Sequence, residues 1–450
     1  MFAFAGVYQW TLVPLFAGVA WLAASVRPRV AHEPFAAIDI ALLVCVAVVA
    51  MQLVPLPDAA RQAISPASFE FDRAIRVEAS VDSLTHPRPL SLDPQSTAWA
   101  LATLGAFVVL FWCGRACIAR GGLRIVARTV AATGLTASTF ALAQHATAPL
   151  LLYWRLRPES TSARPYTPFV NRNDLACWLV MAIPLTTGYL LTRIRARLSR
   201  QAGAPDFESA FDATTMWLAT SACVMLGTLF ATESRSGLTA AAASLLALIA
   251  MSRGRADRRS RGWIFVAIAG VLAVAAAYGN FGALANRVGD AMTDNVGGRR
   301  AIWRETWTMM RDFWAAGVGA GAYERGMLVY QTSPRTHFYF NHAHNGYLQI
   351  LSEGGLMLAV PAAVALMSGI REVVRRLRDD RSAAYWIRAG ATSGMIAAAV
   401  QSVWETGLQR PANAVLFAVL AGVALYDSSR RRSSAPSGPT TIREPDSVQA

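Results

Sequence analysis

The sequence contains no lysine and few charged residues of any kind. Charged residues make up 16% of its 450 residues and apolar residues 54%, whereas soluble domains carry roughly 25% charged residues. The mean hydropathy is +0.34. This composition does not fit an assembly of soluble domains. It indicates a protein that uses lipid as much of its solvent.

Acidic residues are also scarce, so the net charge is +14 and arginine carries all of the positive charge. The 42 arginines outnumber 28 acidic residues. Because these arginines are interspersed with apolar runs of about 20 residues, a soluble nucleic-acid-binding protein is excluded and no nucleic-acid partner is expected. In membrane proteins arginine holds cytoplasmic loops in place and binds phosphate groups.

Cysteine is rare, and none of the five lies in a long polar segment. They are Cys45, Cys113, Cys117, Cys177 and Cys223. No C-x-x-C pair suggests a metal site. We therefore predict that the cysteines are small core hydrophobes.

Long apolar runs fill most of the chain, and a transmembrane helix needs about 20 such residues. Eleven segments qualify: 5–25, 36–55, 96–113, 125–143, 173–192, 214–232, 236–252, 262–280, 346–370, 387–405 and 411–427. The first lacks the features of a cleaved signal peptide, so we expect it to be retained. The sequence predicts an all-α polytopic integral membrane protein with about eleven (10–12) transmembrane helices.

Arginines in alternate connections predict the orientation. Twenty-four of the 42 lie in short segments on one side, which the positive-inside rule makes cytoplasmic. The chain then divides into four parts. Residues 1–280 hold the first eight helices and the periplasmic loops 56–95 and 144–172, and residues 281–345 form a large periplasmic loop with short amphipathic helices. Residues 346–427 hold the last three helices, and residues 428–450 form a disordered cytoplasmic tail.

Polar residues at membrane depth cost free energy, so they usually have a function. One group of them lies at a tight hairpin. Residues 232–237 (TESRSG) separate two apolar segments. Helices this close leave Arg235 little room to reach bulk solvent. Two interpretations remain open: an arginine that extends to the headgroups and is balanced by Glu233, or an anion clamp that faces an inner cavity.

Residues 298–314 predict an amphipathic helix on the outer membrane surface. Its apolar face comprises Ile302, Trp303, Thr306, Trp307, Met310, Phe313 and Trp314. Its arginine face comprises Arg300, Arg304 and Arg311. Arg299 and Arg300 lie in its first turn after two glycines, where free backbone N–H groups favour a phosphate. Contact with lipid headgroups is the alternative for these arginines.

Gly317, Gly319 and Gly321 follow this helix. No strand precedes them and no lysine follows, so a nucleotide-binding loop is excluded. We predict a turn packed closely against another backbone.

Three of the six histidines lie within residues 337–344. His342 and His344 make a poor metal site, because no carboxylate or cysteine is suitably spaced. Neutral imidazole accepts a proton near neutral pH, so His344 is a candidate general base, with an ordinary interfacial histidine as the alternative. Asn345 is expected to orient it. Glu353, further into the span, is either an arginine partner or a structural acid.

Together these motifs resemble the O-antigen ligase and polymerase superfamily. The matching residues, in order, are Ser234-Arg235-Ser236-Gly237, Arg299 with Trp303, Gly317-Val318-Gly319, and His344-Asn345-Gly346-Tyr347-Leu348-Gln349. The asparagine-rich segment 169–173 (FVNRN) also looks like the family's. The resemblance covers roughly residues 165–365, and it departs at Leu358, where ligases tend to have glycine, and in the helix count, which is usually twelve.

The resemblance implies a metal-independent, inverting glycosyltransferase of GT-C-like architecture on the periplasmic face of the bacterial inner membrane, without a cofactor. Members transfer a glycan from undecaprenyl pyrophosphate to lipid A–core, to a growing polysaccharide or to a protein. By matching positions, His344 would activate the acceptor hydroxyl, while Arg235 and Arg299 would hold the pyrophosphate. The further substrate-binding candidates are Arg172, Glu233, Arg300, Arg304, His342 and Asn345.

Two other functions use the same residues without this chemistry. A transporter or flippase would bind a lipid-linked anionic glycan in the arginine cavity. A non-catalytic subunit would assist polysaccharide export. Membrane lipids are expected partners in every case.

Overall fold

The computed structural model describes residues 3–75, 87–158, 164–198, 212–253, 295–332 and 339–427. Within these ranges the regular structure is helical, and β-structure is limited to three isolated bridges. The predicted all-helical class is therefore confirmed for the described part of the chain.

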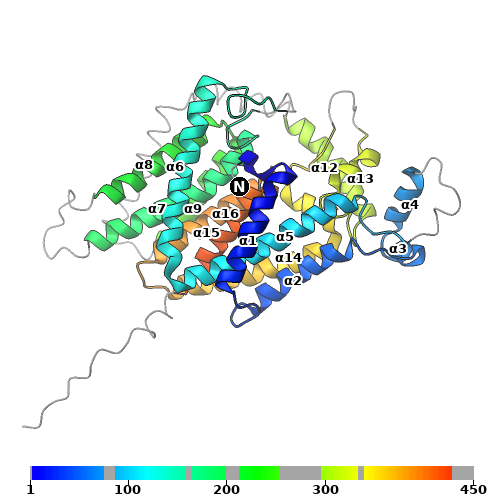
Figure 1. Ribbon diagram of the computed structural model, residues 1–450, viewed down its shortest axis with the longest axis horizontal. Helices are drawn as coiled ribbons and strands as arrows, with labels where there is room; N and C mark the ends of the chain where they lie inside the picture. The colour runs from blue at the N-terminus through cyan, green and yellow to red at the C-terminus, as the bar shows by residue number, and fades with distance from the viewer. Residues whose placement is uncertain are drawn as a thin grey trace, which may run out of the picture.

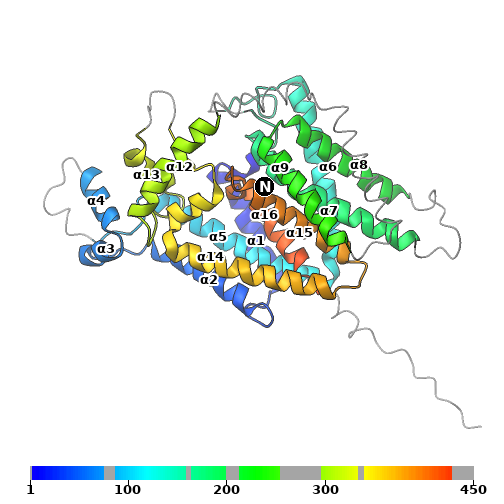
Figure 2. The ribbon, with the colours of Figure 1, turned by 180° about the vertical axis from the view of Figure 1, so that it is seen from behind.

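The main helices are shown in Figures 1 and 2. They are α1 (Val13–Val26), α2 (Ala36–Met51), α5 (Pro94–Cys117), α6 (Leu123–Thr147), α7 (Arg172–Leu198), α8 (Ala213–Ala231), α9 (Arg235–Ser252), α14 (Gly346–Asp379), α15 (Tyr385–Gln401) and α16 (Pro411–Ala424). Shorter or polar helices are α3 (Asp58–Ile64), α4 (Pro66–Ile75), α12 (Asn295–Asp312) and α13 (Tyr323–Tyr330).

Several of these helices suit a membrane. Six stretches of the described chain are long and apolar enough to cross one: Gln9–Val26, Pro94–Thr147, Arg172–Leu198, Ala213–Ala231, Arg235–Ser252 and Gly346–Asp379. Helices α2 and α16 are apolar but shorter. These observations support a multi-pass membrane protein. The predicted span at 262–280 and the tail at 428–450 lie outside the described residues, so the count of eleven stays a prediction.

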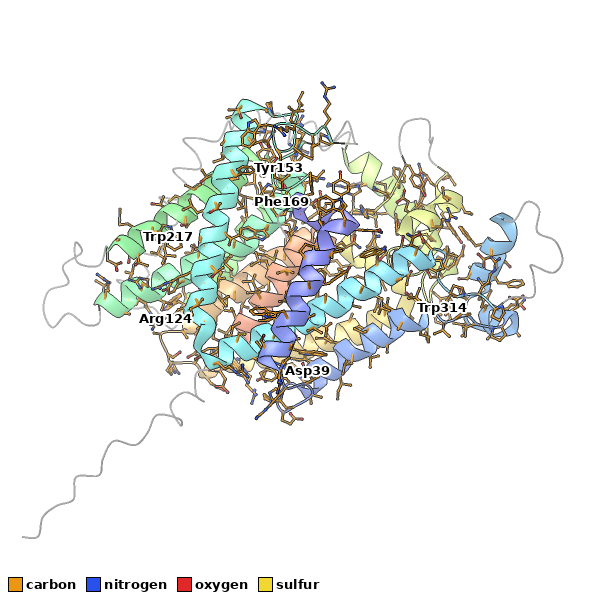
Figure 3. The ribbon with its side chains drawn as sticks, in the orientation of Figure 1. Asp39, Arg124, Tyr153, Phe169, Trp217 and Trp314 are labelled. Carbon is orange, nitrogen blue, oxygen red and sulfur yellow. The ribbon has the colours of Figure 1, made fainter. Side chains whose placement is uncertain are left out.

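The helices meet at two ends, which we name by their connections. The arginine-rich end, named for the arginines in the helix turns that adjoin it, holds the connections 27–35, 118–122 and 380–384; the opposite end holds 148–158, 164–171, 232–234 and 402–410. Figure 3 labels Asp39 and Arg124 near the first end and Tyr153 and Phe169 near the second. The predicted tight hairpin is present at the opposite end, where three residues join α8 to α9.

Helix α7 packs directly against α15 through paired glycines. A Cβ atom on Gly188 would lie 2.2 Å from the carbonyl oxygen of Trp386, and one on Gly390 would lie 2.2 Å from that of Pro184. Small residues permit such backbone contact between membrane helices. This packing fixes the start of α7 beside the end of α15, where the site lies.

The glycine turn after α12 packs against a break in α14. Gly317 has φ +70°, and a Cβ there would lie 2.3 Å from the backbone of Glu353. Gly355 interrupts α14 with φ +57°, and the N–H of Val318 donates to Ser352 O at 2.9 Å. The prediction of a turn packed closely against another backbone is confirmed.

Helix α12 is amphipathic, but the prediction of its faces was partly wrong. Its buried side chains are Ile302, Glu305, Thr306 and Met309, and Phe313 follows them. Trp307 and Trp314 are 56% and 62% exposed. They share the exposed face with Arg300, Arg304 and Arg311. The smaller apolar residues fill the contact with the glycine turn, which leaves the two indoles outside.

The cysteine prediction also needs one correction. Cys45, Cys113 and Cys177 are buried, Cys117 is half-buried, and all five are free thiols. Cys223, however, is exposed on α8. It is not a core residue, because it lies on the outward face of that helix.

Candidate active site

The site is organised by the first turn of α7. Asn171 directly precedes the helix, and its Oδ1 accepts a hydrogen bond from the N–H of Asn173 at 2.9 Å, as residues at helix N-termini commonly do. The next three side chains contact two other segments of the chain: Arg172 lies near Glu233 of the α8–α9 hairpin, whereas Asn173 and Asp174 contact Glu405 and Arg410 of the 402–410 connection. This turn, part of the asparagine-rich segment, therefore joins elements distant in sequence.

Glu405, which follows α15, is the carboxylate at the centre. Its Oε1 accepts from Arg299 Nη2 at 2.7 Å and from Asn173 Nδ2 at 2.9 Å. Its Oε2 lies 3.7 Å from His344 Nδ1. The Glu405 side chain is only 8% exposed, whereas Arg299 and His344 are 35% and 41% exposed. The structure thus brings His344 and Arg299 together through a residue that the sequence analysis missed.

The backbone before α14 fixes the position of His344. His344 has φ +47°, a left-handed conformation that costs a non-glycine residue free energy. On its N-terminal side, the carbonyl of Ala343 accepts from Trp303 Nε1 at 3.0 Å and its N–H donates to Gln349 Oε1 at 2.7 Å. Asn345 caps α14 by accepting from two backbone N–H groups. Its carboxamide oxygen is thus used by the helix, and no hydrogen bond between described residues joins Asn345 to the imidazole, so the predicted orienting role stays a prediction.

The α8–α9 hairpin places Arg235 beside the same turn of α7. Glu233 Oε2 lies 3.5 Å from Arg172 Nη1 and 3.6 Å from Arg164 Nη1. A Cβ on Gly237 would lie 2.8 Å from the Cβ of Ala176, so α9 begins in contact with α7. Arg235, the first residue of α9, is half-buried.

A second set of polar contacts supports the site from Arg410. Arg410 Nε lies 3.2 Å from Asp174 Oδ2, and its Nη2 lies 3.3 Å from His342 Nε2. Burial, followed by the nearby Arg410 charge, lowers the pKa of His342 to about 3. His342 is therefore neutral at physiological pH, and its Nε2 is an acceptor for Arg410. The predicted substrate-binding role of His342 stays a prediction, and in this environment it is a role for a neutral imidazole.

The remaining candidates occupy different settings. Arg300 and Arg304 are exposed on α12, and among the described residues no ion pair connects them to Glu405. Glu353 accepts from Gln349 Nε2 at 2.8 Å, and no described arginine forms an ion pair with it, which favours the structural acid over the arginine partner. The described ranges contain no cluster of three or more histidine, cysteine or carboxylate side chains suited to a metal ion.

The sequence analysis did not identify three residues of this site: Glu405, Asp174 and Arg410. A signal existed for each. Glu405 is a carboxylate at the last position of the predicted span 387–405, and Asp174 follows the asparagine-rich motif. Arg410 precedes the last apolar segment on the side where the charge rule predicts few arginines in short loops.

Comparison with known proteins gives an independent view of these residues. A family model described as O-Antigen ligase matches residues 220–363. This confirms the expected resemblance across the hairpin with Arg235, the start of α12 with Arg299, and the segment with His344. No curated protein matches the chain. Asn173 and Glu405 lie outside the matched region.

Proposed function

We propose, from the place of residues 220–363 in the O-antigen ligase and polymerase superfamily, that the chain is a membrane glycosyltransferase. It transfers a glycan from undecaprenyl pyrophosphate to an acceptor hydroxyl at the periplasmic face of the bacterial inner membrane. The acceptor is lipid A–core, a growing polysaccharide or a protein. The observation that carries the proposal is the bridging of His344 and Arg299 by the buried carboxylate of Glu405.

In this mechanism His344 is the general base. As the acceptor oxygen attacks the anomeric carbon, its proton passes to Nε2 of the imidazole. The adjacent Glu405 carboxylate, 3.7 Å from Nδ1, stabilises the imidazolium that forms, as a carboxylate does in other histidine-based sites. Attack opposite the leaving group inverts the anomeric configuration.

The arginines stabilise the leaving group. The bond between the anomeric carbon and the phosphate oxygen breaks, and its electron pair goes to the pyrophosphate. Arg299 donates to Glu405 through Nη2, and a guanidinium has further donors that can pair with phosphate oxygens. Arg235 supplies a second guanidinium, which can pair with two phosphate oxygens. Preorganised charges of this kind contribute about 3 kcal/mol in a water-poor site.

The deciding experiment separates this function from transport. Purified protein in liposomes is supplied with lipid-linked glycan and acceptor, and product is measured for the wild type, for His344→Ala and for His32→Ala. His32 lies in the 27–35 connection at the arginine-rich end and serves as the control. We expect His344→Ala to lose at least about 100-fold in transfer while it still binds the donor.

Two outcomes would overturn the proposal. Normal product formation by His344→Ala would show that His344 is not the general base. Movement of lipid-linked glycan across the bilayer without any transfer product would instead identify the wild type as a flippase. Activity is also expected to persist in EDTA. Loss of activity in EDTA, followed by rescue with added Zn²⁺, would contradict the metal-independent mechanism.

A further inference from the structure

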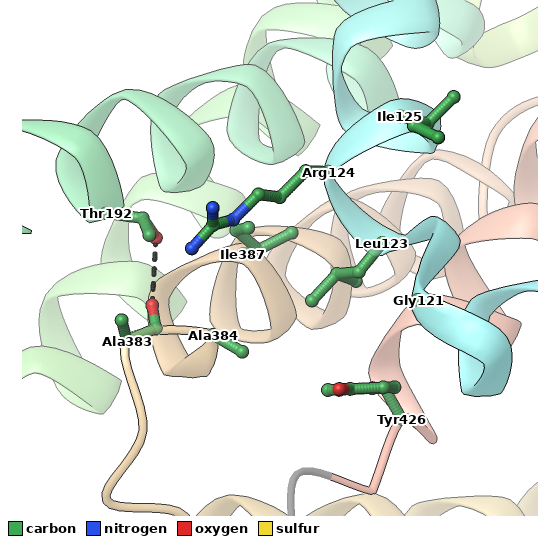
Figure 4. A pocket seen from close by; sticks show the side chains of 9 residues that line it. All are labelled: Gly121, Leu123, Arg124, Ile125, Thr192, Ala383, Ala384, Ile387 and Tyr426. Atoms are coloured by element: carbon green, nitrogen blue, oxygen red, sulfur yellow. Dashed lines mark hydrogen bonds between the residues drawn. The ribbon is translucent and has the colours of Figure 1, made fainter. Parts of the chain in front are cut away.

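A cavity of about 320 Å³ opens at the arginine-rich end, and its lining residues lie outside the matched region 220–363. Arg124 of α6 and Tyr426, just after α16, extend toward it from two sides (Figure 4). Thr192 of α7 also lines the cavity, but its hydroxyl already donates to backbone carbonyls. The guanidinium and the phenol are therefore the polar groups available to a ligand.

A second hollow lies one turn further along α6. It measures about 490 Å³ and is lined by Arg128, Thr129 and Trp217. Arg128 is held in place because its Nε donates to the hydroxyl of Tyr189 at 3.0 Å. Residues four apart lie on the same side of a helix, so the two arginines form one cationic strip between the hollows.

Four carboxylates near this end are already engaged by other arginines. The ion pairs are Asp39 with Arg115, Asp212 with Arg193 and Arg197, Asp380 with Arg388, and Asp427 with Arg376. Hydrogen bonds from Thr215, together with the nearby arginines, lower the pKa of Asp212 to about 2, so it stays an anion. No ion pair of the described residues includes Arg124 or Arg128. Both side chains are exposed and not neutralised by a described carboxylate, so they are accessible to an anion from outside the protein.

Apolar residues around the strip identify the source of that anion. Ile125, between the two arginines, is 68% exposed, and Met216 on α8 is 53% exposed. Exposed apolar side chains next to arginine and tryptophan are typical of the headgroup level of a bilayer. We propose that Arg124 and Arg128 bind the headgroup phosphate of an anionic phospholipid, with Tyr426 as a hydrogen-bond donor and the acyl chains on the apolar flanks.

Native mass spectrometry of the detergent-solubilised full chain tests this site without reference to glycosyl transfer. Phosphatidylglycerol and phosphatidylcholine are titrated against the wild type, Arg124→Gln, the double variant Arg124→Gln/Arg128→Gln, and Arg371→Gln. Arg371 is an exposed arginine of α14 toward the same end and serves as the matched control. We expect phosphatidylglycerol affinity to fall about fivefold for each guanidinium removed, with Arg371→Gln unchanged.

The alternatives give different results. Phosphatidylglycerol binding by the double variant within about twofold of the wild type would overturn the site. Equal binding of phosphatidylcholine would overturn its selectivity for anionic lipid, and complete competition by inorganic phosphate would show that free phosphate, not lipid, is the ligand. Arg124→Lys guards against misfolding, because it preserves the charge and should retain part of the affinity at an unchanged melting temperature.

Discussion

Oε2 of Glu405 lies 3.7 Å from Nδ1 of His344, although the two residues belong to different segments of the chain. The other oxygen of the same carboxylate accepts from Arg299 and Asn173. One buried carboxylate thus couples the proposed base to one of the proposed pyrophosphate ligands. We therefore expect the charge of Glu405, and not only its shape, to matter for turnover.

Glu405→Gln is therefore expected to lower kcat by roughly 100-fold. The amide keeps the size of the side chain, but it cannot stabilise an imidazolium or hold Arg299 by charge. Product formation in liposomes measures the effect, and the exposed Glu324 of α13 provides the control, Glu324→Gln, with unchanged kcat. Wild-type turnover in Glu405→Gln would show that the carboxylate has no role beyond packing.

The arginines should not tolerate lysine. Arg299→Lys and Arg235→Lys each retain a positive charge but lose the fork that pairs with two phosphate oxygens. We expect each variant to lose at least about tenfold in kcat/KM. Arg325→Lys, at an exposed position of α13, is the matched control and should behave as the wild type. Near-normal rates in both site variants would contradict the pyrophosphate role.

The lowered pKa of His342 predicts that the folded protein is less stable in acid. Its pKa in the folded protein is about 3, below the value of about 6.5 for an exposed imidazole. The unfolded chain therefore takes up a proton that the folded chain does not. The stability associated with a neutral His342 is complete above about pH 6.5 and decreases as the pH falls toward 3, by at most about 2 kcal/mol at pH 5.

The measurement is the melting temperature in detergent at about pH 7.5 and about pH 5. His342→Asn removes the titrating group, so its Tm should fall by a few degrees less than that of the wild type. An identical acid-induced loss in the two proteins would show that His342 titrates normally in the folded state.

The spans and the glycine turn were predictable because their signals are local. Runs of apolar residues identify membrane helices, and alternating glycines identify close backbone contact. The faces of α12 were less predictable, because hydrophobicity alone assigned Trp307 and Trp314 to the apolar face, opposite the arginines. The contact with the glycine turn accommodates Met309 and Phe313, and both indoles are left exposed beside arginines. Which apolar residues fill a contact depends on the partner surface, which the sequence does not contain.

The site was predictable only where short motifs mark it. Arg235, Arg299 and His344 were singled out by their local sequence settings, and the family resemblance then gave them roles. Glu405 was not, because its importance arises from where α15 ends relative to α7 and α12. For Asn345 a local rule was available: asparagine directly before a helix commonly caps it, and its side chain does so.

The ion pair between Asp39 and Arg115 provides the last prediction, which concerns stability. Asp39 is fully buried, and its two oxygens accept from Arg115 at 2.9 and 2.7 Å, from Trp112 Nε1 at 3.0 Å and from the N–H of Ala31 at 2.9 Å. Asp39→Asn leaves the buried guanidinium without its counterion, which costs about 3 to 5 kcal/mol. We expect a Tm several degrees lower in detergent.

A double variant separates the pair's charge from its packing. Asp39→Leu combined with Arg115→Met removes both charges, so the desolvation cost that penalises the single variant disappears. Its Tm should lie closer to the wild type than that of Asp39→Asn. If the double variant is the less stable of the two, the hydrogen bonds around Asp39 stabilise the contact between α2 and α5 more than the apolar replacement does, and the prediction fails.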